Sequence, residues 1–174
     1  PRSTLFPYTT LFRSDALIVG NDTVDESVLC SADRLQVVHM HGTGIDAIDL
    51  ECATRKGILV MNAPGANRNA VAETTVALML SAGRKVMEHA QLLHDGKWER
   101  CPGNEISGSC VGMIGLGNIG RRVVELLTGF EPRFLAYDPQ PNFVWAASHQ
   151  VRLADTMEDV FKHADFLVDR KSVV

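Results

Sequence analysis

Three glycines, Gly115, Gly117 and Gly120, followed by Asp138, are the residues whose types and spacing most clearly imply chemistry. The glycines satisfy the G-x-G-x-x-G pattern. In that pattern the first allows a tight turn, the second lets a pyrophosphate approach bare backbone, and the third lets a helix pack closely on the preceding strand. Asp138 lies at roughly the 20-residue distance at which a carboxylate accepts hydrogen bonds from an adenosine ribose. A 2′-phosphate there would meet like charge, so the pattern predicts binding of NAD in preference to NADP.

The segments around these residues have the character that such a site requires. An apolar run at residues 111–114 predicts a buried parallel strand, and a helix is expected to begin within the glycine loop that follows. The free N–H groups and partial positive charge of that helix start would face the phosphates. A second predicted strand, residues 133–137, ends at Asp138. The alternative is a glycine-rich turn that serves only close packing, which would not require this agreement between the segments.

Strand and helix signals alternate along the rest of the chain, which predicts an α/β fold with parallel sheets. Strands are predicted at residues 16–19, 35–40, 58–61 and 166–168, and helices at 25–32, 49–56, 70–93 and 156–163. The helix at 70–93 is the longest, and its apolar stripe is expected to pack between two domains. Loops at 42–44 and 62–67 follow two of the strands, and their glycine and proline content is typical of turns.

Composition excludes several classes of partner. A net charge of −4 with no basic stripe gives nucleic-acid phosphates little to bind, and no apolar run is long enough to cross a membrane. The cysteines form no C-x-x-C pair, so a reduced cytoplasmic protein is expected, with Cys52 and Cys110 in the core. His39 and His41 alternate along a predicted strand without a neighbouring ligand cluster, so no metal site is expected.

Several separated motifs in one order resemble the NAD-dependent D-isomer-specific 2-hydroxyacid dehydrogenase family, and within it the phosphoglycerate dehydrogenases. The motifs are RLQVV at residues 34–38, HGTGIDAIDLECATRKGILVMNAPGANRNAVAE at 41–73, DGKWER at 95–100, GLGNIG at 115–120 and YDP at 137–139. The likeness covers nearly everything from residue 15 to residue 168. It implies an oxidoreductase that transfers hydride between NAD and the CH–OH group of a D-2-hydroxy acid, with 3-phosphoglycerate among the candidate substrates and a 2-keto acid as product.

The resemblance also implies an architecture of parallel three-layer sheets in two domains, with the active site in a cleft between them. Residues 15–69 would be part of a flavodoxin-like substrate domain, and residues 70–168 the first half of a Rossmann NAD-binding domain with its linking helix. The full-length protein is expected to be a homodimer, with residues 70–93 at the interface. Residues 1–14 and 169–174 resemble translated sequencing-adapter DNA and are expected to be foreign to the fold.

Particular site residues carry over from the family. Thr43 and Gly44 match the loop whose backbone N–H groups hold the substrate carboxylate, and Thr43 also matches a cofactor contact. Asn118 and Ile119 match the pyrophosphate-binding pair, and Asp138 matches the acid that binds the ribose. A loop with free N–H donors at the carboxyl end of a strand suits a carboxylate. An ordinary strand-to-helix turn is the alternative that the residues at 42–44 leave open.

The chain departs from the family pattern at two positions near that loop. Met40 stands where phosphoglycerate dehydrogenases commonly have Arg, and Ala47 stands where they commonly have Asn. Because methionine cannot pair with a phosphate, recognition of a phosphorylated substrate is in question. Arg68, from a neighbouring loop, is the candidate to replace the missing cation.

No counterpart of the family's catalytic Arg, Glu and His is found in this chain, so no catalytic residue is assigned. About three strands are predicted for the dinucleotide domain, where roughly six are typical. We therefore expect an inactive fragment of a dehydrogenase. Two alternatives remain: a non-catalytic NAD-sensing regulator that resembles the family's corepressors, and a Rossmann enzyme of other chemistry, such as a methyltransferase-like fold. In the second of these the loop at 42–44 would have no role.

Overall fold

A computed structural model describes residues 13–20 and 22–169, and the chain divides at Asn67 and Arg68 into two compact units. Each unit is described by itself. The segments expected to be foreign lie outside the described residues, apart from positions 13, 14 and 169. Of these, Asp169 is the last residue of a strand and pairs with Ile114.

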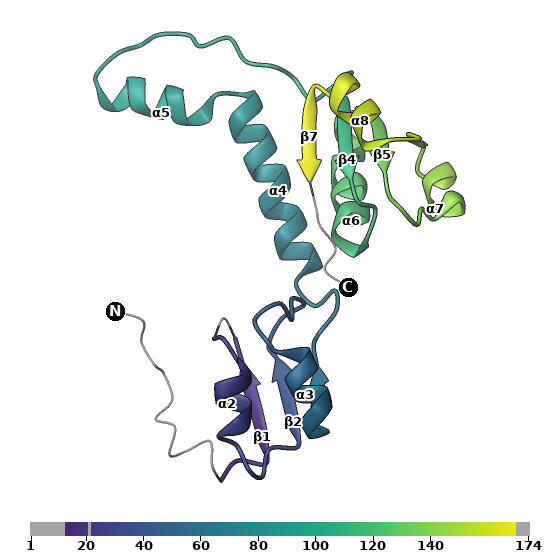
Figure 1. Ribbon diagram of the computed structural model, residues 1–174. Coiled ribbons are helices and arrows are strands. Elements are labelled where there is room, and N and C mark those ends of the chain that lie inside the picture. Colours follow the sequence, from purple (N-terminus) through teal and green to yellow (C-terminus); the bar gives the residue numbers. More distant parts are fainter. Residues whose placement is uncertain (1–12, 21, 170–174) are drawn as a thin grey trace. The chain divides into compact units, whose positions relative to one another are not determined.

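The first unit is built on a three-stranded parallel sheet in the order β1-β2-β3 (Figure 1). Its strands are β1 (Ala16–Val19), β2 (Val37–Met40) and β3 (Leu59–Met61). Helix α2 (Glu26–Cys30) connects β1 to β2, and α3 (Leu50–Lys56) connects β2 to β3. Parallel neighbours require such crossovers, so the alternation seen in the sequence is that of consecutive β-α-β units.

Both helices of this unit begin at an aspartate cap, and α3 also ends where its sequence predicts. The Asp25 carboxylate accepts a hydrogen bond from the Val28 N–H at 3.0 Å and caps α2, and Asp49 caps α3 by accepting from the Cys52 N–H at 2.8 Å. Gly57 then ends α3 in the left-handed conformation, with φ of 68°. Glycine adopts this conformation without a steric cost. Its position at the C-cap confirms the predicted end of the helix.

The core of the first unit lies between its sheet and its two helices. Leu17 and Val19 of β1 are buried, whereas Ile18 between them is 70% exposed. Since neighbouring residues of a strand point to opposite faces, one face of this sheet packs against a core that includes Leu29 of α2 and Cys52 of α3. Within the described residues the first unit therefore has two layers.

The second unit contains a four-stranded parallel sheet in the order β6-β5-β4-β7. Figure 1 shows β5, β4 and β7 of this sheet. Its strands are β4 (Cys110–Ile114), β5 (Arg133–Tyr137), β6 (Val151–Leu153) and β7 (Phe166–Asp169). The chain runs outward from β4 to β6 and then returns to place β7 on the other side of β4. Strand order therefore reverses at β4, and ligands of such sheets bind beyond the carboxyl ends of the strands at that point.

Helices cover both faces of this second sheet. The longer helices α4 (Arg68–Gly83) and α6 (Asn118–Leu127) pack together, and the core on their side includes Val111 and Met113 of β4. Val160 of α8 (Met157–His163) packs with Cys110 and Leu135 in a second cluster. Odd and even residues of β4 thus face different helices, and the second unit has the predicted three layers.

The predicted single helix at 70–93 is wrong, because the structure has two helices there. Helix α4 ends at Gly83, and α5 (Val86–His94) follows a residue, Lys85, in the left-handed conformation with φ of 50°. The Gly83 carbonyl accepts a hydrogen bond from the Asn104 N–H at 2.7 Å instead of from the next helical turn. A Cβ at Gly103 would collide with the same carbonyl oxygen. A tertiary contact therefore ends α4 where the local pattern predicts continuation.

Two further elements lie in the stretch after Asp138 for which no element was predicted. Helix α7 (Phe143–Ser148) is capped by Asn142, which accepts a hydrogen bond from the Trp145 N–H at 2.9 Å, and β6 follows it. The second unit thus has four described strands where three were predicted. Strand β6 has only three residues, and its alternation of apolar Val151 and Leu153 around the exposed Arg152 is too short to be recognised in the sequence.

None of the helices in the described part of the chain combines the length and the apolar character that a membrane span would need.

Candidate cofactor and substrate loops

The glycine loop lies where the sheet topology places a ligand site, directly after β4. It is joined to the end of the neighbouring strand by a hydrogen bond of 2.8 Å from the Gly115 N–H to the Tyr137 carbonyl. Helix α6 begins at Asn118, with Gly117 as its N-cap. The predicted strand, loop and helix start are therefore all present.

Two of the three glycines have the structural roles that the sequence predicts. Gly115 has φ of 93°, a conformation that side chains other than hydrogen rarely adopt, and it makes the tight turn. A Cβ at Gly120 would collide with the Gly115 carbonyl oxygen. Only glycine lets the first turn of α6 lie this close to the loop. The role predicted for Gly117, close approach of a pyrophosphate, stays a prediction.

Unpaired backbone donors gather at the start of α6. Within the described residues the N–H groups of residues 117–120 donate no hydrogen bond, and no side chain caps the helix. The first N–H groups of a helix have no intrahelical acceptor, and the helix dipole adds partial positive charge at this end. Gly117, Asn118, Ile119 and Gly120 can therefore hold an anion such as a pyrophosphate.

A single peptide group, that of Leu116, is held from both sides at the centre of the loop. The Leu116 N–H donates to Asp138 Oδ2 at 2.6 Å, and the Leu116 carbonyl accepts from Arg121 Nε at 2.7 Å. The guanidinium of Arg121 also lies 5.4 Å from the ring centre of Trp145, close enough for a cation–π contact. These contacts fix the loop relative to the end of β5 and the first turn of α6.

Asp138 is thus a support of the loop as well as a candidate ligand of the cofactor. Its second oxygen, Oδ1, accepts from the Gln140 N–H at 2.8 Å. Each carboxylate oxygen has two lone pairs, so both can still accept a ribose hydroxyl. The sequence pattern finds Asp138 through its distance from the glycines, but it does not reveal the role of Arg121. The only signal for that role is the position of an arginine one residue after the last glycine.

The other predicted loop lies in the first unit, after β2. Asn62 Nδ2 donates to the Thr43 carbonyl at 2.7 Å, and the Thr43 hydroxyl lies 3.3 Å from the Ala63 carbonyl. The N–H groups of Thr43 and Gly44 donate no hydrogen bond within the described residues. The loop is therefore tied to the segment after β3, and its backbone donors remain open for a carboxylate.

The residues that depart from the family pattern lie in different environments. Met40, the last residue of β2, is buried in the core of the first unit. Ala47 packs at the edge of that core. Arg68 is the first residue of α4 in the second unit and is exposed. The thioether of Met40 therefore contributes packing at this site, and no charge.

The cysteines include one pair that the sequence does not predict. The four, all within the described residues, are free thiols, and Cys52 and Cys110 are buried as expected. Cys30 and Cys52 come from different helices, yet their Sγ atoms and a carboxylate oxygen of Glu26 lie within 4.8 Å of one another. Their separation in sequence hides this, because only the packing of α2 on α3 brings them together.

Comparisons with known proteins find a matching family profile and similar curated proteins. The sequence profile described as D-isomer specific 2-hydroxyacid dehydrogenase, catalytic domain, matches residues 9–169. The D-3-phosphoglycerate dehydrogenase of Methanocaldococcus jannaschii is 40% identical over 157 residues, which are 88% of this chain and 30% of that protein. The human D-3-phosphoglycerate dehydrogenase is 39% identical over 156 residues, with 88% and 29% covered. The chain thus spans about a third of the length of these curated relatives.

Solved structures show the same fold. A D-lactate dehydrogenase from Aquifex aeolicus, complexed with NAD and lactic acid, has a TM-score of 0.88 at 24% identity, with 95% of this chain and 50% of that chain covered. An NAD+-bound 3-phosphoglycerate dehydrogenase from Entamoeba histolytica has a TM-score of 0.80 at 25% identity, with 96% and 49% covered. With a family profile that matches nearly the whole sequence, the chain belongs to the D-isomer specific 2-hydroxyacid dehydrogenase family.

Proposed function

We propose that this chain is part of an NAD-dependent oxidoreductase that acts on the CH–OH group of a D-2-hydroxy acid. The observation that carries the proposal is the set of open N–H groups at residues 117–120, which lie at the strand-order reversal beside a fixed Asp138. Such a site suits a dinucleotide because it offers donors to a pyrophosphate and an acceptor to a ribose.

The residues present fit NAD. The N–H groups of Asn118 and Ile119, which donate no hydrogen bond within the described residues, would receive the pyrophosphate. Asp138 would accept the ribose hydroxyls, and its charge would repel the 2′-phosphate of NADP. When bound, NAD supplies the hydride acceptor for oxidation of the alcohol. The chain's own residues position it.

We assign the substrate carboxylate to the backbone donors of Thr43 and Gly44, whose N–H groups are open and whose loop is tied down by Asn62. The relatives named as D-3-phosphoglycerate dehydrogenases suggest a phosphorylated substrate. Met40 is buried and offers a phosphate no charge. Arg68 is exposed and is the cation that we propose for the phosphate, should the substrate carry one.

On this proposal the first unit belongs to a substrate domain, for which residues 15–69 are expected, and the second to an NAD-binding domain at 70–168. We infer that the full-length protein is a cytoplasmic homodimer. The exposed apolar residues on α4 and α5, namely Leu78, Val86, Met87 and Leu93, support a dimer interface on this segment. Neither nucleic acid nor a membrane is expected as a partner.

The decisive experiment uses the full-length protein that contains this sequence. NADH absorbance is followed with phosphohydroxypyruvate, hydroxypyruvate and glyoxylate as competing substrates. Oxidation of NADH by any of them is the expected result, and the preferred substrate shows whether a phosphate is recognised. If Arg68 binds that phosphate, Arg68→Ala raises KM for phosphohydroxypyruvate and leaves KM for hydroxypyruvate unchanged. Tight NADH binding without turnover on all three would contradict the enzyme and favour the regulator.

A further inference from the structure

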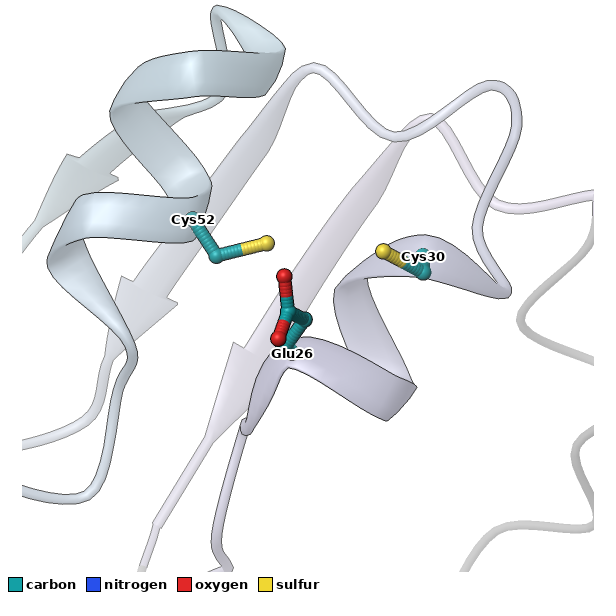
Figure 2. A group of neighbouring side chains, drawn as sticks. All are labelled: Glu26, Cys30 and Cys52. Atoms are coloured by element: carbon teal, nitrogen blue, oxygen red, sulfur yellow. The ribbon is translucent and has the colours of Figure 1, made fainter.

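Outside the two loops, one group of side chains has the composition of a ligand set. Glu26 and Cys30 lie one helical turn apart on α2, and Cys52 lies on α3. Figure 2 shows the three side chains turned toward one another in the space between these helices. One candidate ligand atom from each lies within 4.8 Å of the other two.

We propose that Glu26, Cys30 and Cys52 form a binding site for a thiophilic divalent cation, of which zinc is the representative. Two thiolates favour zinc and related soft or borderline ions over magnesium and calcium, which prefer oxygen ligands. Three protein ligands leave one of the four zinc positions for water or a small ligand. This site is independent of the proposed cofactor and substrate loops.

The geometry requires only a small adjustment. With Zn–S bonds of about 2.3 Å in a tetrahedral site, two sulfur ligands lie roughly 3.8 Å apart. The observed upper limit of 4.8 Å is about 1 Å larger, a difference that rotation of side chains can supply. Residues four apart on a helix share one face, which explains why Glu26 and Cys30 can both reach the same ion.

Contacts already present hold the two helices at the distance that the site needs. Arg55 of α3 donates to Glu26 Oε1 at 2.8 Å, and Lys56 Nζ donates to the Leu29 carbonyl at 2.9 Å. Each contact joins α3 to α2, so the ligands do not depend on the metal to bring them together. Glu26 keeps its second oxygen free of hydrogen bonds within the described residues.

The charges of the ligands, the ion and the neighbouring Arg55 also nearly cancel. Binding releases one proton from each thiol, so two thiolates and one carboxylate around a divalent cation leave a net charge of −1. The guanidinium of Arg55 lies against the carboxylate and offsets that charge. Partners in this outer position orient ligands and are commonly important for metal affinity.

The test titrates Cd²⁺ and Co²⁺ into the reduced 174-residue chain. Charge-transfer bands in the ultraviolet report thiolate ligands, and the visible Co²⁺ spectrum reports tetrahedral geometry. Competition with a chromophoric chelator gives the Zn²⁺ affinity and stoichiometry. We expect one ion per chain, and at least a tenfold loss of affinity in Cys30→Ser and in Glu26→Gln. Both positions are exposed, so these variants should keep the fold.

Cys101→Ser is the matched control, because Cys101 is a free thiol outside the cluster. It should bind Zn²⁺ like the parent chain. Equal loss of affinity in Cys101→Ser and Cys30→Ser, or unchanged affinity in Cys30→Ser, would overturn the proposal. The proposal would also be overturned if the reduced chain takes up no metal and mild oxidation lowers its mass by two hydrogen atoms, because the pair would then be assigned to a disulfide formed by the added oxidant. NADH affinity should be the same with and without zinc, which separates this site from the proposed function.

Discussion

Asp138 illustrates how one residue can support a binding loop and select a ligand. It accepts the Leu116 N–H through one oxygen and keeps lone pairs for a ribose. Its negative charge is therefore the feature that should distinguish NADH from NADPH. Its support of the loop needs only an acceptor, which an amide oxygen can also provide.

Replacement of Asp138 by Asn should accordingly change cofactor preference more than loop structure. We expect the ratio of NADPH to NADH affinity to rise at least about tenfold, as measured by fluorescence titration, because the like charge that opposes a 2′-phosphate is removed. Asp165→Asn is the control, since Asp165 accepts the Cys110 N–H at the opposite end of β4. A similar change in both variants would contradict the assignment.

Cys110 allows a test by pH. Burial raises the pKa of the Cys110 thiol, with a further rise from Asp165 that the positive charge of Arg133 opposes. In the folded chain this thiol should stay protonated and resist iodoacetamide at a pH where Cys101 reacts. Mass spectrometry of alkylated peptides measures both sites, and unfolding in guanidinium should expose Cys110. Equal rates in the folded chain would contradict the burial of the thiol.

The raised pKa of Cys110 also determines whether the free energy of unfolding rises or falls with pH. A thiol with a raised pKa keeps its proton longer in the folded state than in the unfolded state. Its contribution to stability is complete below the unfolded value of about 8.5 and declines as the pH rises toward the folded pKa. The free energy of unfolding should therefore fall with increasing pH in this alkaline range.

At the scale of elements, local signals predicted those parts of the fold that local chemistry decides. The Asp49 cap and the Gly57 terminus bound α3 as expected, and the glycine loop joins β4 to α6 as expected. Tertiary contacts decided the rest. The bond from Asn104 to Gly83 ends α4, and β6 is too short for its alternation to be recognised. In the site, the roles of Arg121 and of the Cys30–Cys52 pair depend on packing that residue spacing does not show.

The junction of the glycine loop and α6 is the element most sensitive to added volume. In Gly120→Ala the new methyl group would meet the Gly115 carbonyl, which is backbone and cannot rotate away. We expect a loss of about 3 kcal/mol in stability and of measurable NADH binding, by chemical denaturation and titration. Gly129→Ala is the control because no atom lies within 4 Å of its added Cβ. A harmless Gly120→Ala would show that the helix can move away from the loop.

At the break between α4 and α5, a substitution to glycine should raise the free energy of unfolding, whereas within a helix it should lower it. Lys85 has φ of 50°, which costs a residue with a Cβ roughly 1 kcal/mol, so Lys85→Gly should raise the free energy of unfolding by up to about that amount. Lys162→Gly lies inside α8 and should lower it by about 1 kcal/mol. Urea denaturation of both variants measures the difference. A loss of stability in both would mean that the strain at Lys85 is absent in solution.

For the molecule as a whole, we expect that binding of NADH and catalytic turnover can be observed separately. The residues proposed to hold NAD are present, whereas we expect no counterpart of the family's catalytic Arg, Glu and His in this chain. We expect the 174-residue chain to bind NADH, measured by fluorescence, and to show no oxidation of it with hydroxypyruvate or glyoxylate. Turnover by the isolated chain would show that other residues can replace the family's acid–base pair.

The contacts that end α4 also determine what should happen when the chain is cut in the exposed connection after α5. Helix α4 packs on α6, and its Gly83 carbonyl is bonded to Asn104, whereas the intervening residues 95–100 are exposed. Stability within a protein follows such cooperative contacts and not the order of the sequence. A protease that cuts the exposed connection would therefore leave two peptides that remain associated, with α4 still docked on the sheet. The second unit could accept a nick, a new pair of termini or an inserted tag at this place without losing its core.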